Sequence, residues 1–483
     1  MYFTAGQIEA WMGIIANAYP ECTRTILPNT THDGKQVSML RLRAGEGESR
    51  HGVLFVGGTH AREWVNPDAL LELAADLLFA YDNNASITYG GKEWSATTVK
   101  LILETLDVYL LCLNNPDGRE YSQTVYSMWR KNRRSNPGSD EGVDINRNLQ
   151  PLWSGQPGSS CTMSSETYAG PGVFSEPETK NVKWILDNYD IHCFVDVHSY
   201  SQLVLYPWGH APTQTNDSTA RFTALPTAAC NDVTPPGYKE YMPPVDLQRF
   251  QIIAQRAVDA IAAVNGNVYT PQPGIDLYAT TGTHGDYPYA RHVANGRATK
   301  TYSFTFETGV VFQPADPKPV KDEAKSGLMA ILQNCICAID LIGTSLFGSS
   351  DEGQTATSAL RKLRDDVLLR TDAGQEWIGL FERNQTDLTS LVLEDREAAE
   401  VAPKLLIGAG EVVDRDAELG RDHVELIQAL AERMARRTES ERQRADMASV
   451  VDVAREFTGR GRDDIIEQML ARPPKGSGRQ SAD

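Results

Sequence analysis

The sequence of 483 residues lacks several features that would indicate membrane insertion, nucleic-acid binding or secretion. It contains no run of about 18 apolar residues, so it has no candidate transmembrane helix. Basic residues are scarce: 46 Lys and Arg against 64 Asp and Glu give a net charge of −18. Because phosphate binding needs clustered basic side chains, we expect neither nucleic acid nor a membrane surface as a partner. Residues 1–10 lack the pattern of a signal peptide, which favours a cytoplasmic location by default.

Cysteine is also scarce. The seven cysteines are an odd number without paired spacing, which excludes a disulfide framework. Cys112 and Cys193 lie in apolar runs and are expected to be buried thiols. A single bridge that involves Cys161 or Cys230 stays open, and a reducing compartment is mildly favoured.

What the chain does contain is an alternation of strand and helix patterns over its first 340 or so residues. This alternation predicts an α/β domain, residues 1–347, with a mixed, mostly parallel twisted sheet flanked by helices. Residues 348–355 are rich in Gly and Ser and are typical of a linker. Residues 356–472 show only helical patterns and predict a smaller all-α region. The Pro- and Gly-rich end, 473–483, is expected to be disordered.

Local patterns predict individual elements of the α/β domain. Residues 37–43 and 52–58 have the patterns of two strands paired with each other. The polar, Gly-rich stretch 83–93 is typical of a loop, and 114–118 of a turn. Residues 217–230 are expected to form a helix.

The most informative stretch is the apolar strand 53–56, which runs into the Gly57-Gly58 turn. His60 and Glu63 follow, just before a predicted helix at 67–80. In an open α/β sheet, ligands bind in the crevice beyond the strand ends. A His-x-x-Glu pair there can supply two zinc ligands. The alternative is a surface histidine and a helix-start glutamate favoured by the helix dipole.

Two further strands end in side chains of the same kind. His198 closes the buried strand 191–198, and Glu307 follows the alternating strand 300–306. Strand ends that share one edge of a sheet can bring two imidazoles and two carboxylates together. Zinc catalysis needs ligands of these types, together with a free carboxylate that accepts a proton from water.

The irregular stretch 119–168 adds Arg130, Asn146 and Arg147. A stretch of this length without regular elements is usually functional or disordered. Arginine with asparagine can hold a carboxylate through paired hydrogen bonds. The alternative is a solvated surface loop.

These residues belong to seven short segments with a shared order and spacing. The segments are 59–65 (THAREWV), 115–118 (NPDG), 129–133 (WRKNR), 144–148 (DINRN), 165–168 (SETY), 196–202 (DVHSYSQ) and 302–307 (YSFTFE). Together they resemble the metallocarboxypeptidases of the pancreatic carboxypeptidase A/B type, the peptidase M14 family. The resemblance covers roughly residues 5–346 and implies that the first domain hydrolyses C-terminal peptide bonds of peptides and proteins.

The resemblance implies a single Zn²⁺ held by two histidines and one glutamate, namely His60, Glu63 and His198. It implies that Glu307 is the general base and that Arg130 stabilises the oxyanion. Asp144 resembles the carboxylate that orients the first zinc histidine.

The same resemblance implies the substrate contacts. Asn146 and Arg147 would hold the terminal carboxylate of the substrate. Tyr278 matches the mobile tyrosine that caps the substrate, and Arg62 and Tyr200 match positions in the outer subsites.

The chain departs from the family pattern at its specificity pocket. Gly285 occupies the position at which the basic-selective type has an aspartate. Thr305 and Gly209 permit a roomy, neutral pocket, so we expect apolar or aromatic C-terminal residues. His284, beside Gly285, leaves room for some acidic ones.

Two other departures concern the chain outside the site. No segment resembles the family's N-terminal inhibitory region, so we expect an enzyme made in its active form. Asp140 stands near the position of a family cysteine that pairs with one near Cys161, so that bridge is expected to be missing.

Two other functions are compatible with these residues. One is a zinc amidase acting on peptidoglycan stem peptides or acidic side chains, and the other is a non-catalytic module that binds C-termini. The region 356–472 is expected to pack on the catalytic domain or to mediate oligomers, with binding of a partner or cell wall as the alternative.

Overall fold

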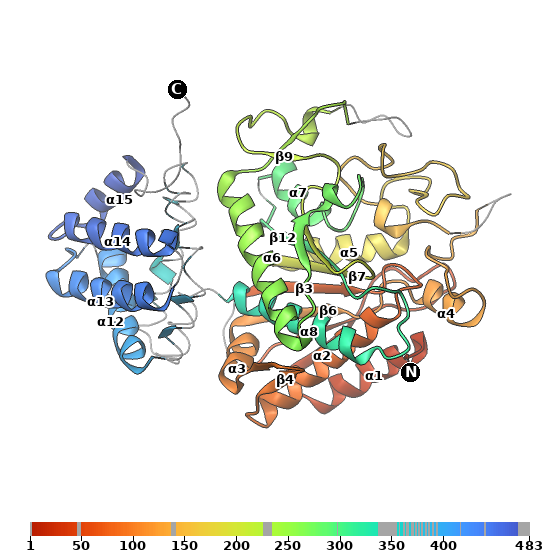
Figure 1. The fold of residues 1–483 in the computed structure, drawn as a ribbon, viewed down its shortest axis with the longest axis horizontal. Coiled ribbons are helices and arrows are strands. Elements are labelled where there is room, and N and C mark those ends of the chain that lie inside the picture. Colours follow the sequence, from red (N-terminus) through yellow and green to blue (C-terminus); the bar gives the residue numbers. More distant parts are fainter. Residues whose placement is uncertain are drawn as a thin grey trace. The chain divides into compact units, whose positions relative to one another are not determined.

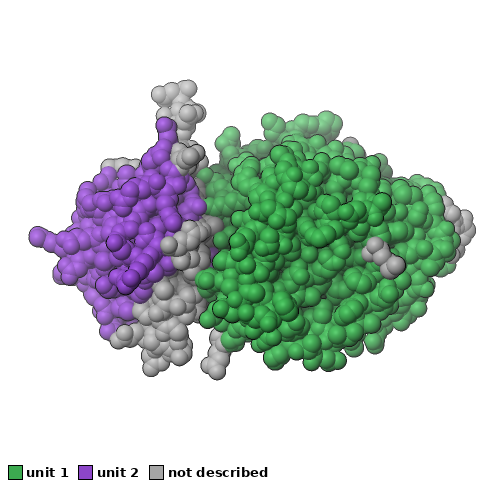
Figure 2. Space-filling view, turned by 60° about the horizontal axis from the view of Figure 1, so that its bottom comes forward, with its two compact units in different colours: residues 1–335 green, residues 336–483 purple. Residues whose placement is uncertain are grey.

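The computed structural model describes most of both parts of the chain. In the first part it describes residues 2–45, 50–136, 142–225, 234–296 and 298–336. In the second it describes 396–415, 417–438 and 441–471, with scattered positions from 355 to 395. The chain divides into two compact units, Met1–Cys335 and Ile336–Asp483 (Figure 2). The predicted tail lies outside the described residues, as does nearly all of the predicted linker.

An eight-stranded sheet forms the centre of the first unit (Figure 1). Its strands, in spatial order, are β1 (Cys22–Ile26), β2 (Ser38–Leu42), β6 (Leu106–Leu111), β3 (His51–Gly57), β7 (Ile191–His198), β12 (Tyr302–Glu307), β8 (Leu203–Tyr206) and β11 (Thr270–Pro273). The four central strands β6, β3, β7 and β12 are parallel to one another, and β11 is parallel to β8. The other three pairs are antiparallel. The predicted mixed, mostly parallel sheet is confirmed.

Helices cover both faces of this sheet. They are α1 (Ala5–Ala18), α2 (Val65–Asp82), α3 (Ala96–Thr105), α4 (Pro116–Thr124), α5 (Pro177–Asn188), α6 (Pro244–Asn265), α7 (Tyr287–Ala294) and α8 (Lys318–Cys335). On one face, Leu54 and Phe194 of the sheet pack in one core with Ile185 of α5. On the other face, α8 approaches β12 and α6 closely, because a Cβ on Gly327 would lie 2.7 Å from the Phe306 ring. Among the described residues, no helix is long and apolar enough to cross a membrane.

Short elements complete the first unit. They are the strands β4 (Ile87–Tyr89), β5 (Lys92–Trp94), β9 (Thr213–Gln214) and β10 (Glu240–Tyr241), and the 3₁₀ turns η1 (Ile145–Arg147), η2 (Phe222–Ala224) and η3 (Gly274–Asp276). They lie in the connections rather than in the central sheet.

The described part of the second unit is helical and contains no strand, as predicted. Its continuous helices are α12 (Arg396–Arg415), α13 (Arg421–Arg437), α14 (Glu441–Glu456) and α15 (Arg462–Ala471). Leu406, Leu430, Met434 and Met447 share a buried core of their own. Residues 417–420 interrupt the helical pattern and separate α12 from α13. The function of this unit stays a prediction.

Four local predictions are wrong. β2 and β3 are not paired, because β6 lies between them and bonds to both. The stretch 83–93 contains the β4–β5 hairpin rather than a simple loop. The predicted turn at 114–118 begins helix α4, because the Asn115 side chain accepts the Gly118 N–H at 2.9 Å and caps it. Within 217–230 the described residues form only η2.

The predictions about the cysteines are confirmed in part. Cys112 and Cys193 are buried free thiols, as predicted, and so are Cys22 and Cys335. Cys161 is disulfide-bonded, so it takes part in the one bridge that the sequence left open. Asp140 lies outside the described residues, so the expected loss of the family bridge at that position is untested.

The strand register determines where the functional side chains meet. In the parallel pair β7–β12, His198 lies directly opposite Glu307. In the pair β3–β7, Gly57 lies opposite Val197, so the turn after β3 emerges beside His198. The N–H of Asn115 donates to Gly58 O at 3.2 Å, and this bond holds the turn against the end of β6.

We predict that Gly58→Ala destabilises the protein by about 2–4 kcal/mol. Gly58 has a φ of +66°, and a Cβ there would lie 2.6 Å from the Leu113 side chain and 2.9 Å from Pro67. Left-handed strain of about 1–2 kcal/mol adds to an overpacking cost of similar size. Urea denaturation followed by tryptophan fluorescence measures the loss.

Gly34→Ala is the matched control. Gly34 has a φ of +79°, but no atom lies within 4 Å of the position that its Cβ would take, so only the backbone strain applies there. Equal losses at the two glycines would contradict the claim that the turn before His60 is fixed by close packing.

Candidate metal centre and substrate pocket

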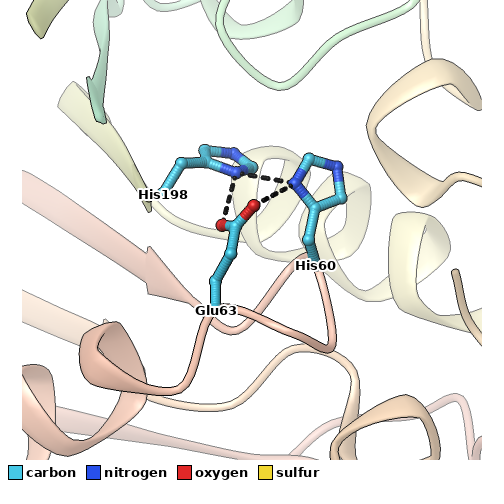
Figure 3. A group of neighbouring side chains, drawn as sticks. All are labelled: His60, Glu63 and His198. Carbon is cyan, nitrogen blue, oxygen red and sulfur yellow. Dashed lines mark hydrogen bonds and ion pairs between the residues drawn. The ribbon is translucent and has the colours of Figure 1, made fainter. Parts of the chain in front are cut away.

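Three buried side chains meet at the carboxyl ends of β3 and β7 (Figure 3). His60 Nδ1 lies 2.8 Å from Glu63 Oε1, and His198 Nδ1 lies 3.0 Å from Glu63 Oε2. The two Nδ1 atoms are 3.0 Å apart. The donor atoms all lie within 4.8 Å of one another, and this is the one group of its kind among the described residues.

The far side of each imidazole faces a buried carboxylate. His60 Nε2 lies 3.2 Å from Asp144 Oδ1, and His198 Nε2 lies 2.7 Å from Asp196 Oδ2. An ionised carboxylate only accepts, so each Nε2–H donates and each Nδ1 turns its lone pair to the centre. When both rings are neutral, two lone pairs and a carboxylate so close together repel unless a cation lies between them. Two nitrogens and one oxygen suit Zn²⁺ and leave room for a fourth ligand.

The electrostatics of the centre are consistent with this. Burial, and next the positive charge of Arg130, lower the pKa of His60 and keep its ring neutral. Burial alone would raise the pKa of Asp144, but Arg130, at 2.8 Å, holds it well below its usual range. Burial would lower the pKa of His198, yet Asp196 raises it well above normal. A metal ion must therefore displace a proton from this histidine, which makes metal binding pH-dependent.

Backbone hydrogen bonds hold the ligand turn in place. The N–H of Glu63 donates to His60 O at 3.2 Å, and the N–H of Ala61 donates to Arg130 O at 2.9 Å. The N–H of Ser199 donates to Glu63 Oε2 at 3.2 Å, so the residue after His198 also orients the carboxylate ligand. The β7 end and the β3–α2 turn are thereby linked directly.

A cavity of about 260 Å³ opens beside this centre. Of the ten site residues predicted from sequence, all but His198 line it: His60, Arg62, Glu63, Arg130, Asn146, Arg147, Tyr200, Tyr278 and Glu307. His198 lies buried behind and reaches the centre through Nδ1. The structure therefore brings the predicted residues together around one space.

Two arginines and an asparagine line one side of the cavity. Arg130 donates from Nε and Nη2 to Asp144 Oδ2, at 3.1 and 2.8 Å. Arg147 is buried and donates from Nη1 to Asn146 O at 2.7 Å and from Nε to Gly158 O. Arg130 Nη1 and Arg147 Nη2 have no hydrogen-bond partner among the described residues, so each is available to a ligand.

Glu307 is half-buried and lines the same cavity. Its carboxylate makes no hydrogen bond to any described residue. Burial raises the pKa of this carboxyl group to about 8. A carboxyl group with such a pKa can exchange a proton near neutral pH.

Aromatic side chains form the outer wall. The Arg62 guanidinium lies 4.5 Å from the centre of the Phe312 ring, and Tyr200 packs edge-on against the same ring at 4.9 Å. Tyr278 is 50 % exposed and Tyr200 is 44 % exposed, so both can contact a bound molecule.

The structure adds site residues that sequence reasoning missed. Asp196 stands two positions before His198 on β7, and residues two apart share one face of a strand, so the sequence did carry this signal. Phe312 lines the cavity but follows no pattern. His284 is fully buried and does not line the cavity, which removes the basis for the expected tolerance of acidic residues.

Comparison with known proteins adds independent evidence. The zinc carboxypeptidase family matches residues 8–317. The chain belongs to this family. Carboxypeptidase A4 of Mus musculus is 28% identical over 332 residues, which is 67% of this chain and 67% of that protein. Carboxypeptidase B of Astacus astacus is 31% identical over 313 residues, which is 63% of this chain and 86% of that protein.

Solved structures share the fold. The crystal structure of thrombin-activatable fibrinolysis inhibitor matches with a TM-score of 0.55 at 24% identity, over 70% of this chain and 75% of that one. The bovine form in complex with tick carboxypeptidase inhibitor matches with a TM-score of 0.54 at 23% identity. The match covers 70% of this chain and 98% of that one. The protein is thus a metallocarboxypeptidase, an exopeptidase that hydrolyses peptide bonds, with a His-Glu-His group that can hold its metal ion.

We predict that chelator-treated protein takes up one Zn²⁺ per chain and gains thermal stability from it, since a ligand that binds only the folded state stabilises that state. His198→Ala should weaken zinc binding by more than about 100-fold, because losing even a partner of a ligand costs about 10- to 100-fold. Zinc titration against a competing chelator measures the affinity.

His192→Ala on the same strand is the control. His192 lies at the start of β7, at the other end of the strand from His198, and its ring stacks on His51. Zinc binding should therefore be unaffected. Wild-type affinity in the His198 variant would remove this residue from the ligand set.

Proposed function

We propose that this carboxypeptidase releases single C-terminal residues with neutral apolar or aromatic side chains, and that Glu307 is its general base. One observation carries the proposal. The carboxylate of Glu307, free of partners among the described residues, shares a cavity with the metal-ligand group and with two arginines that have unused donors.

The proton chemistry falls to Glu307. A zinc ion held by the three ligands supplies a Lewis acid that lowers the pKa of a water molecule. Glu307 would take a proton from the water whose oxygen bonds to the carbonyl carbon, and would pass that proton to the amine nitrogen as the C–N bond breaks. Arg130 donates from Nη1 to the negative charge that develops on the carbonyl oxygen. Loss of one such donor costs about 100- to 1,000-fold in comparable acyl-transfer sites.

Arg147 and Asn146 account for the restriction to C-termini. The Arg147 guanidinium is almost inaccessible to solvent, and its positive charge gains most from a carboxylate that enters the cavity. An internal peptide bond offers no such charge and would leave the guanidinium with Asp144, 4.0 Å from its Nη1, as its ionic partner. The Asn146 side chain lines the same wall and supports binding of the same carboxylate.

The floor of the cavity supports a preference for neutral residues. Gly209 and Gly285 contribute no side chain there, and the Gly209 N–H donates to both oxygens of Asp286 at 3.0 Å. His210 Nδ1 lies 3.6 Å from Asp286. Burial would lower the pKa of His210, but Asp286 and Glu240 raise it to about 9, so its ring is cationic at neutral pH. This charge is shared between Asp286 and Glu240, whose Oε2 lies 3.0 Å from His210 Nε2, so it offsets part of the negative charge of Asp286.

Blocked dipeptides that end in Phe, Leu, Lys or Glu, with the Phe amide as a fifth substrate, test the proposal. We expect kcat/KM to be at least about 10-fold higher for Phe and Leu than for Lys and Glu, since the wrong side chain leaves a buried charge unpaired. The amide should lose about 100-fold or more, and chelator should abolish all turnover.

Each other outcome has a distinct meaning. A preference for Lys would show that Asp286 is not neutralised. Equal rates on acid and amide would contradict the role of Arg147. No turnover with zinc bound would favour a C-terminus-binding module, and activity confined to peptidoglycan stem peptides would favour an amidase.

We predict that Glu307→Gln lowers kcat by about 100- to 10,000-fold, as expected for loss of a general base. Zinc affinity should change by less than about threefold, because Glu307 is not a ligand. Glu93→Gln, at an exposed position of β5, is the matched control and should retain full activity. Retained turnover in the Glu307 variant would remove the base assignment.

A further inference from the structure

One fully buried side chain near the site has no part in the proposed reaction. His284 has no solvent exposure, and its ring stacks on Phe194 with the ring centres 6.3 Å apart. Its Nδ1 lies 3.1 Å from Asp196 Oδ2, and its backbone N–H donates to Asn146 Oδ1 at 2.8 Å. One residue therefore contacts both the metal-ligand network and a substrate-binding residue.

Its side chain acts on His198 through Asp196. The same Oδ2 of Asp196 lies 2.7 Å from His198 Nε2, and Oδ1 accepts the Thr59 hydroxyl at 2.9 Å. Thr59 bonds one oxygen and His198 bonds the other, which His284 Nδ1 approaches to 3.1 Å without the alignment of a hydrogen bond, so the carboxylate has little freedom to rotate. Because Asp196 contacts the His198 ring opposite Nδ1, its rotation would turn Nδ1 away from the metal centre.

Its backbone acts on Asn146. The amide oxygen of Asn146 accepts the His284 N–H, so this oxygen is committed to the protein. The NH₂ group of the same amide lies 3.5 Å from His198 Nε2, and its two hydrogens make it the part of the amide that can donate to a ligand in the cavity. The loop that carries His284 thus orients the Asn146 amide so that its NH₂ group, rather than its oxygen, faces the carboxylate of a bound substrate.

We propose that His284 is a positioning residue that couples the metal ligand His198 to the substrate-binding Asn146. The proposal rests on the proposed function, in which these two residues bind zinc and the substrate carboxylate. His284 touches neither zinc nor substrate itself. A packing role and a positioning role are distinguished by the atoms that each requires, since packing needs the ring and positioning needs the nitrogen.

Two substitutions separate these roles. His284→Phe keeps the ring and removes the nitrogen, whereas His284→Asn loses the ring but keeps an amide nitrogen as far from Cβ as Nδ1 is. We expect the Phe variant to bind Zn²⁺ about 10- to 100-fold more weakly in the absence of substrate, the range seen when a partner of a metal ligand is lost. The Asn variant should stay within about threefold of wild type.

A spectroscopic readout accompanies the affinities. With Co²⁺ in place of Zn²⁺, the visible absorption bands should shift in the Phe variant and not in the Asn variant, because the bands report ligand geometry. KM for a blocked dipeptide with a free C-terminus should rise in the Phe variant more than kcat falls. His292→Phe is the control, since His292 lies near the end of α7 and its one hydrogen bond to the described residues is with Ala298 O.

The proposal is overturned if the Phe variant keeps wild-type zinc affinity and cobalt spectrum, or if the Asn variant is as weak as the Phe variant. If the Phe variant does not fold, a double-mutant cycle of His284→Ala with Asp196→Asn decides, because each of these single changes removes the contact between the two side chains. Coupled effects on zinc affinity support the proposal and additive effects overturn it. Zinc affinity is measured without substrate, so a failure here leaves the turnover tests of the proposed function standing on their own.

Discussion

The central constraint on this structure is that three metal-binding side chains, His60, Glu63 and His198, are buried close together and repel one another unless a cation lies between them. Two imidazole lone pairs and a carboxylate face one another at about 3 Å. Nothing in a low-dielectric interior favours this arrangement without a positive charge at its centre. Asp144 and Asp196 fix the two rings from behind, and these carboxylates are in turn held by Arg130 and Thr59. Much of the buried polar structure near the sheet edge therefore serves to keep one ion site open.

The parallel sheet supplies the geometry for this site. Adjacent strands β7 and β12 are in register, so His198 and Glu307 emerge side by side, while the Gly57-Gly58 turn brings His60 and Glu63 to the same edge. The irregular connection after β6 then places Arg130 and the η1 turn over the opening. Elements far apart in sequence contribute one residue or two each, which suits a scaffold whose strands are rigid and whose loops carry the chemistry.

The sequence was informative where the local pattern of residue types is compatible with one structure. Apolar runs ending in His, Glu or Gly-Gly predicted the strands of the site and the side chains at their ends. The roles of the arginines, the asparagine and the tyrosines that line the cavity were implied by the family resemblance. It was weaker where tertiary context decides. Residues 37–43 and 52–58 have the patterns of strands, but their sequences contain no signal that β6 lies between them in the sheet. Likewise, the Asn115 side chain turned a predicted turn into a helix start, because the same residue type serves both.

The role of His284 shows the same limit. Its neighbour Gly285 lines the cavity, so its sequence position suggested the pocket, yet its side chain points into the protein and contacts Asp196. Neighbours in a chain can face opposite ways, and only the structure reveals which one faces the ligand. Asp286, the residue after Gly285, returns to the cavity wall.

X-ray absorption at the zinc edge of the zinc-loaded protein would identify the ligands of the metal ion. Two imidazole nitrogens and one carboxylate oxygen should coordinate the zinc ion at about 2.0–2.2 Å, together with one oxygen from solvent. A first shell that contains sulfur at about 2.3 Å, or only one imidazole, would contradict this ligand set.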